Sequence, residues 1–114
     1  MQETDPNGID QHESGSKLDD GKVLAGVLSD FSLALIEVAK VGSFGAKKYS
    51  RGGWQSVPDG ITRYSDALWR HLLAERHELT DRESGLIHQA HLAWNALSRL
   101  ELMLRESDLI RWEA

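Results

Sequence analysis

The chain has 114 residues, of which 27% are charged, with a net charge of −5 and no cysteine. This length is enough for one domain with a modest core, and the lack of cysteine excludes disulfides and thiolate metal sites. The negative charge argues against a dedicated nucleic-acid-binding protein, which normally carries a basic face. No apolar run is long enough to span a membrane. These features predict a small cytoplasmic protein.

The first sixteen residues are polar and lack the apolar block of a signal peptide. Their composition predicts a disordered tail over residues 1–16. Residues 17–114 are then expected to form a single helical domain.

Two helices are predicted in the first two thirds of the chain, over residues 29–42 and 61–76. Apolar residues three or four apart form their expected core stripes: Phe31, Leu35 and Val38 in the first, and Tyr64, Leu68 and Leu72 in the second. The connector between them, residues 42–60, holds five glycines and a proline, so we expect no continuous helix there beyond a helical turn at residues 44–49.

A third helix is expected from near Thr80 to about residue 106, because Thr80 and Glu83 have the spacing of a capping box. Its apolar residues form a near-heptad seam: Leu86, Ala90, Ala93, Leu97, Leu100 and Leu104. No strand-like alternation competes with these patterns. The sequence therefore predicts an all-α fold, a small bundle of about three main helices.

A narrow polar strip lies on the opposite side of the third helix from the Leu/Ala seam. His88, His91, Asn95 and Ser98 fall within about 80° of one another at 100° per residue. A helix that is apolar nearly all round is usually buried on both sides. Because three helices cannot easily bury it, we expect a homo-oligomer, with the strip facing a cavity or a neighbouring subunit.

The second helix offers matching polar groups at its end. His71 and Glu75 lie on its core side, and Glu78, Asp81 and Glu83 follow at the junction with the third helix. Antiparallel packing would bring them together with the histidines of the third helix. Imidazole and carboxylate ligands together suit a divalent transition metal, and carboxylates alone suit magnesium or manganese. The alternatives are hydrogen-bonded core histidines and acids that complement a helix dipole.

The connector contains a basic and aromatic group: Lys47, Lys48, Tyr49, Arg51 and Trp54 beside a Gly-Gly pair. Cations on a flexible backbone can cradle phosphates, and an aromatic ring can stack on a base. Short basic loops are also commonly just solvated, so this group indicates a ligand only if the polar pocket lies next to it.

The chain resembles the N-terminal domain family of phage-type dATP/dGTP diphosphohydrolases. The likeness covers roughly residues 18–102 and is carried by several motifs in order: LDDGK, FGAKKY, Trp54, RY at 63–64, RHLLA at 70–74, DRESGLIHQAH and NAL. The resemblance implies a helical protein that splits purine deoxynucleoside triphosphates into monophosphate and pyrophosphate with a divalent metal. The matching positions are Asp19, Lys22, Lys47, Lys48, Tyr49, Trp54, Arg63, His71, Asp81, Glu83, His88, His91 and Asn95.

The resemblance to the better-known all-α NTP pyrophosphatases is more distant. The MazG-like group binds magnesium through an E-E-x-x-E helix and an E-x-x-D helix. The third helix here has neither motif and carries His88-x-x-His91 instead.

Two hypotheses about function follow. In the first, the chain is a magnesium- or manganese-dependent nucleotide pyrophosphohydrolase. Its expected catalytic residues are Glu75, Asp81 and Glu83, its metal ligands are His88, His91 and Asp81, and its ligand-binding residues are Lys47, Lys48, Tyr49, Arg51, Trp54, Arg63, His71 and Asn95. In the second, it is a non-catalytic anti-defence sponge that sequesters a host immune-signalling nucleotide, such as a cyclic nucleotide or an ADP-ribose derivative. Acids that converge on the histidines favour the first, and acids that face solvent while Lys47, Lys48 and Arg63 line the cavity favour the second. A third alternative is a purely structural module for helical assembly.

Overall fold

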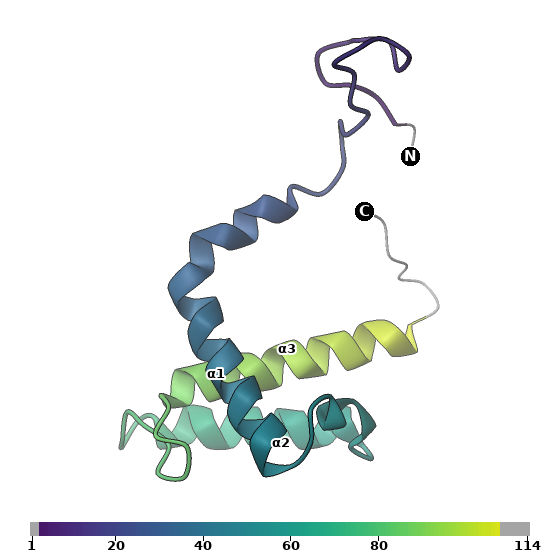
Figure 1. Cartoon of the computed structure of the whole chain (residues 1–114). Coiled ribbons are helices and arrows are strands. Elements are labelled where there is room, and N and C mark those ends of the chain that lie inside the picture. The colour runs from purple at the N-terminus through teal and green to yellow at the C-terminus, as the bar shows by residue number, and fades with distance from the viewer. Residues whose placement is uncertain (1–2, 108–114) are drawn as a thin grey trace. The chain divides into compact units, whose positions relative to one another are not determined.

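A computed structural model describes residues 3–107 and confirms the all-α prediction. Within that range there are helices and two isolated bridges but no strand. The elements in chain order are η1 (Ala25–Phe31), α1 (Ser32–Lys48), η2 (Gly53–Ser56), α2 (Gly60–Ala74) and α3 (His88–Glu106) (Figure 1). Residues 108–114 of the expected domain lie outside the described residues. None of the described helices has the length and hydropathy of a membrane span.

The described chain divides into two compact units, residues 3–29 and residues 30–107. The first unit is rich in turns and is organised around the carboxylate of Asp5. That carboxylate accepts hydrogen bonds from the backbone N–H groups of Asn7, Ile9 and Lys17. These bonds, the one from Lys17 foremost, hold the pKa of Asp5 below its usual range. The expected disorder of residues 1–16 stays a prediction.

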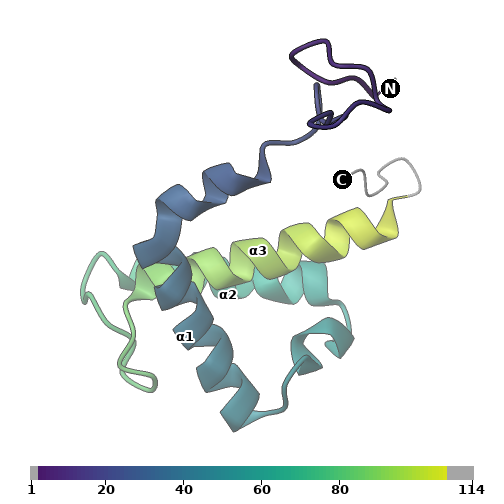
Figure 2. The same cartoon turned by 45° about the horizontal axis from the view of Figure 1, so that its top comes forward.

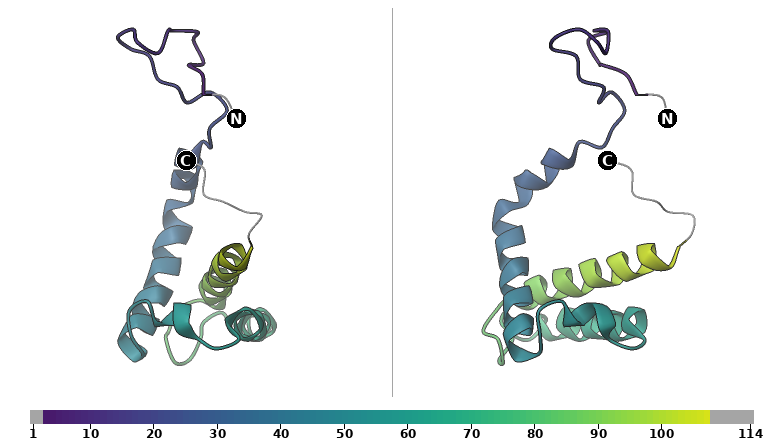
Figure 3. Two further views of the ribbon diagram at one scale, coloured as in Figure 1. Left: turned by 90° about the vertical axis from the view of Figure 1, so that its right-hand side faces the viewer. Right: turned by 45° about the vertical axis from the view of Figure 1, so that its right-hand side comes forward.

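The second unit holds the three long helices. In each view α2 and α3 run side by side, with the chain reversing direction between them (Figures 1 and 2). Figure 3 shows α1 lying against one side of this pair. Trp94 of α3 makes that contact: a Cβ at Gly42 of α1 would lie 2.6 Å from its ring.

The structure corrects the expected length of the first helix. It begins at Ser32, three residues after the predicted start, and continues through Gly42 and Gly45 to Lys48. A glycine inside a helix costs only about 1 kcal/mol, which packing can offset. Glycine is needed at position 42 because only a residue without a side chain fits against Trp94. The helical turn expected at residues 44–49 is thus the last turn and the C-cap of α1.

The start of the third helix was also predicted wrongly. α3 begins at His88, eight residues after Thr80, and residues 79–87 form a tight reversal instead. The N–H of His88 donates to the carbonyl of Leu79, and the N–H of Asp81 donates to that of Leu86. Gly85 has a φ of +73°, a conformation that favours glycine. Thr80 and Glu83 therefore do not form a capping box.

The side of α3 that faces α2 is the polar strip. His88, His91, Asn95 and Ser98 are all buried, so the strip faces a neighbouring helix of the same chain. The Leu/Ala seam lies largely outward: Ala90 is buried, but Leu97 and Leu100 are 53% and 51% exposed. The stripe expected for the first helix is exposed as well, at Leu35 of α1 and at Phe31, the last residue of η1. The expected core stripes therefore proved wrong in these two helices.

The other end of the α2–α3 pair is closed by η2. The rings of Trp54 and Trp94 meet edge to face with centroids 6.3 Å apart, and the hydroxyl of Tyr64 donates to the carbonyl of Trp54 at 2.7 Å. Gly60 is buried where α2 begins, and a Cβ there would lie 2.8 Å from Leu102. These contacts fix the register of the two helices.

Candidate metal centre

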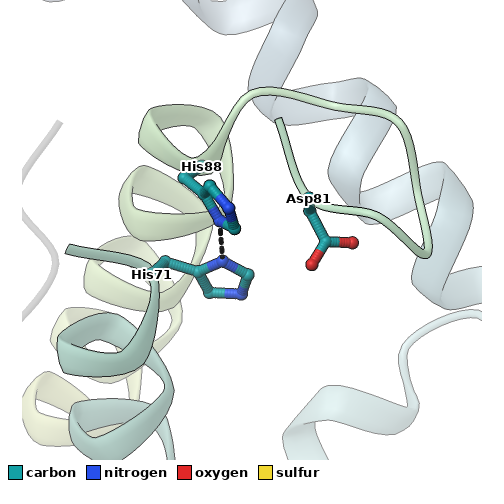
Figure 4. A group of neighbouring side chains, drawn as sticks. All are labelled: His71, Asp81 and His88. Carbon is teal, nitrogen blue, oxygen red and sulfur yellow. Dashed lines mark hydrogen bonds between the residues drawn. The ribbon is translucent and has the colours of Figure 1, made fainter. Parts of the chain in front are cut away.

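A cluster of polar side chains fills the end of the α2–α3 pair where the two helices are joined. Figure 4 shows His71, Asp81 and His88 converging from α2, the joining loop and α3. The Nδ1 atoms of His71 and His88 lie 2.9 Å apart and share a hydrogen bond. One donates and the other accepts, so at least one of the two rings is neutral at that nitrogen. One ligand atom from each of the three residues lies within 4.8 Å of the others.

The second histidine of α3 lies beside this triplet. The ring of His91 stacks on that of His71 with centroids 4.4 Å apart and planes 8° from parallel. Its Nε2 is 2.6 Å from the hydroxyl of Ser84 and 3.9 Å from Oδ2 of Asp81. Asn95, one turn further on, donates to the backbone carbonyl of His91. His91 thus contacts the loop through Ser84 and supports the face of His71.

The orientation of His88 is set from outside the triplet. Its Nε2 lies 3.4 Å from Oε1 of Glu78, which leaves Nδ1 directed at His71. Glu78 also accepts a hydrogen bond from Arg82 at 2.9 Å, and this bond, more than that from His88, keeps the pKa of Glu78 below its usual range. A carboxylate behind an imidazole is the common arrangement that fixes the tautomer of a metal-ligating histidine.

The loop is built to hold Asp81 in place as a carboxylate. Its side chain accepts a hydrogen bond from the N–H of Ser84 at 2.8 Å, and its backbone carbonyl accepts one from Gly85. Burial pushes the pKa of Asp81 upward, but the hydrogen bonds from Ser84 and the nearby histidines outweigh it and leave the pKa below its ordinary value. Asp81 is therefore ionised at neutral pH.

Two of the histidines, His71 and His91, are held in the neutral form. Burial lowers the pKa of His71 to about 4, with further contributions from His91 and His88. Burial also lowers the pKa of His91. Neutral imidazoles beside an ionised carboxylate are the protonation states in which these groups bind a cation.

The other acids expected at the site are held elsewhere. With the Gln89 amide placed so that both its groups are satisfied, its nitrogen donates to the two oxygens of Glu75 at 2.9 and 3.2 Å. Glu83 is exposed and pairs with Lys48, which the extended α1 carries to the joining loop. Of the acids after α2, the structure thus brings Asp81 and Glu78 to the histidines.

The remaining residues expected to bind ligand are spread over the second unit. Lys47, Tyr49, Arg51 and Arg63 are exposed, and Arg63 donates to the carbonyl of Pro58. Trp54 packs on Trp94 and lies under the guanidinium of Arg105, so its ring is engaged in the fold. Among them, the structure brings Lys48 beside the loop that holds Asp81.

Sequence reasoning missed Ser84, whose hydroxyl and N–H contact His91 and Asp81. A signal was present in the letters DRESG, an Asp followed three residues later by Ser and then by Gly. That spacing is typical of a turn closed by an aspartate side chain. The capping-box interpretation assigned the same letters to a helix start instead.

The packing of the helices and this cluster of side chains define a small all-α protein with a partly buried histidine–carboxylate site. The family model described as dATP/dGTP diphosphohydrolase, N-terminal, matches residues 12–110. The chain therefore belongs to this family, which confirms the resemblance seen in its sequence.

One curated relative is the protein named dATP/dGTP diphosphohydrolase of Salmonella phage PMBT28. It is 36% identical over 104 residues, which make up 89% of this chain and 34% of the relative. The chain thus spans about a third of the length of that relative. No solved structure matches the chain.

Proposed function

We propose that this chain handles purine deoxynucleoside triphosphates and carries the metal-binding residues of a pyrophosphohydrolase. The single observation that supports this most is the convergence of His71, Asp81 and His88, with a neutral His71 and an ionised Asp81. The name of the phage relative supports the substrate class. Because the match covers only 34% of that relative, we propose, and do not infer from its name alone, that this chain shares its activity.

The donor set decides which metal fits. Magnesium prefers oxygen ligands and keeps several waters, whereas two imidazoles and one carboxylate suit manganese, zinc and similar transition metals. His71 and His88 would supply nitrogen and Asp81 oxygen. We therefore propose a transition metal, manganese being the member of the expected pair that fits. When bound, such an ion would neutralise phosphate charge and lower the pKa of a bound water.

The chain's own residues have separable roles around that site. Glu78 holds the ring of His88 so that its Nδ1 points inward. Ser84, which lies in the loop, holds the side chain of Asp81 in the loop and that of His91 on α3. We assign phosphate binding to Lys48, which forms an ion pair with Glu83 at the loop. A phosphate group would replace Glu83 as the partner of this lysine. Of the three acids first expected to be catalytic, Asp81 is the one we retain at the centre.

The test is incubation of the purified chain with dGTP or dATP and Mn²⁺, with the products resolved by ion-exchange chromatography. We expect the monophosphate and pyrophosphate, and a rate at least about 100-fold lower for Asp81→Asn. The matched control is Asp66→Asn, an exposed acid on α2, which should retain the rate.

Nucleotide recovered intact from metal-loaded protein would overturn hydrolysis by this chain. Intact nucleotide that copurifies and is released only by heat would instead establish the binding-protein alternative.

A further inference from the structure

The outward side of α3 is apolar without interruption over its last four turns. We define the α3 outer face as the six residues on this side: Ala93, Ala96, Leu97, Leu100, Met103 and Leu104. None of them is charged, whereas Arg99, Glu101 and Arg105 all lie on other sides of the helix. Leu97, Leu100 and Met103 are 53%, 51% and 43% exposed.

No helix within residues 32–107 of the second unit covers this face. α2 packs on the polar strip on the opposite side of α3, and α1 packs at Trp94. Figure 3 shows α1 on one side of the α2–α3 pair, and α1, α2 and α3 are the long helices of the second unit. Among the described residues only Val41 and Ala90 are buried apolar side chains, so the second unit by itself lacks the core that its composition could provide.

The order of residue sizes along the face indicates what covers it. Small residues, Ala93 and Ala96, occupy its beginning, and large residues, Leu100, Met103 and Leu104, occupy its end. If a two-fold axis runs perpendicular to α3, the two copies of the helix are antiparallel, and the small half of each copy meets the large half of the other. A two-fold interface uses the same patch on both subunits, and this patch is complementary to itself.

The available area is sufficient for such a contact. The half-exposed leucines and methionine and their neighbours offer roughly 400 Å² of apolar surface, within the range of the largest patches on monomers, which are often functional. An interface on this face would also include the polar residues at its edges. With the usual apolar share of about 60%, two copies would bury about 1,300 Å² in total, in the range of stable specific interfaces.

We propose that a second copy of this chain occupies the α3 outer face, with the two α3 helices antiparallel about a two-fold axis near Leu97 and Leu100. The absence of charge argues against a polar partner, because a polar surface would be desolvated there without compensation. This interface is independent of the metal site, which faces the other side of α3. The oligomer expected from the sequence would therefore be built by the leucine side of the helix, while the histidine side remains inside each subunit.

The first test is the mass in solution by light scattering. We expect a dimer of the 12.8 kDa chain and a dissociation constant raised at least about 100-fold by Leu100→Glu. The matched control is Leu33→Glu, a leucine of α1 that is 83% exposed and outside the face, which should leave the dimer intact. Circular dichroism verifies that both variants are helical. A chain that is monomeric at 100 µM, or a dimer insensitive to Leu100→Glu, overturns the proposal.

The second test remains informative even if Leu100→Glu unfolds. Because the chain has no cysteine, single cysteines can be introduced at Ala93 and Leu104. A mixture of Ala93→Cys and Leu104→Cys should form a disulfide between unlike chains on mild oxidation, and neither variant alone should do so readily. Cross-linking of each variant with itself, without the mixed product, would contradict the antiparallel arrangement.

Discussion

Two sides of the same helix, α3, invert the usual distribution of polarity in a small protein. The side toward α2 carries His88, His91 and Asn95 and is buried, whereas the opposite side carries Leu97 and Leu100 and is half exposed. Buried polar groups cost free energy unless they are hydrogen-bonded, and exposed apolar groups stabilise nothing until something covers them.

The fold of the single chain does not account for the polarity of either side of α3. On the inner side the histidines find partners in Glu78, Ser84 and one another, an arrangement more demanding than an apolar core of the same volume. On the outer side the leucines find none within residues 30–107. We propose a ligand as the reason for the inner side and a second subunit as the reason for the outer side.

The largest effect should come from removing a ligand on the inner side. For His88→Gln we expect at least about a 100-fold loss of Zn²⁺ or Mn²⁺ affinity by isothermal titration calorimetry, because even groups behind the ligands typically change affinity 10- to 100-fold. His77→Gln is the matched control, since His77 is exposed just after α2. Equal losses in both variants would show that the ion binds at the surface, and the inner side would then be only structural.

Two glycines in α1 test a third side of α3, the side on which Trp94 packs against α1. At Gly42 an added Cβ would meet the Trp94 ring at 2.6 Å, and at Gly45 it would meet nothing within 4 Å. We expect Gly42→Ala to destabilise the fold by about 1–2 kcal/mol net, and Gly45→Ala to stabilise it by up to about 1 kcal/mol. Urea unfolding followed by circular dichroism measures both, and shifts of the same sign would disprove the close contact.

A third comparison uses a pH dependence that comes from the inner side. The pKa of His71 falls from its usual 6.5 to about 4 on folding. Between these values the unfolded chain binds a proton that the folded chain does not, so stability should be lost as the pH falls from about 6.5 to 4. Thermal unfolding in the presence of EDTA at pH 7.5 and 5 measures the loss. His71→Asn should reduce it, and an unchanged slope in that variant would argue that the ring is not buried as described.

Local patterns predicted the helices well where the cause was itself local. The span of α2 was predicted to within two residues at either end, since its apolar period and the proline and glycine before it lie in the same stretch. The grouping of His71, Asp81 and His88 was also foreseeable, because antiparallel helices joined by a short loop bring their near ends together.

Other features depended on distant contacts. α1 continues through two glycines because Trp94, some fifty residues away, packs on Gly42. The loop from Leu79 to His88 is closed by hydrogen bonds of Asp81, Ser84 and Gly85. The sequence of this segment is equally compatible with the start of a helix. The triplet contains His71 rather than His91 because of where the imidazole rings lie in the fold. The spacing of these residues along the sequence does not specify those positions.

By itself, then, the sequence determined that the chain is all-α, that α3 has a polar side and an apolar side, and which side chains could form a site. Only the tertiary structure decided which side of α3 turns inward. Helical periodicity places residues on common faces, but the direction of each face depends on the neighbours that cover it. In α3 the covering helix brings His71 to the polar strip, and the leucine side is left facing outward.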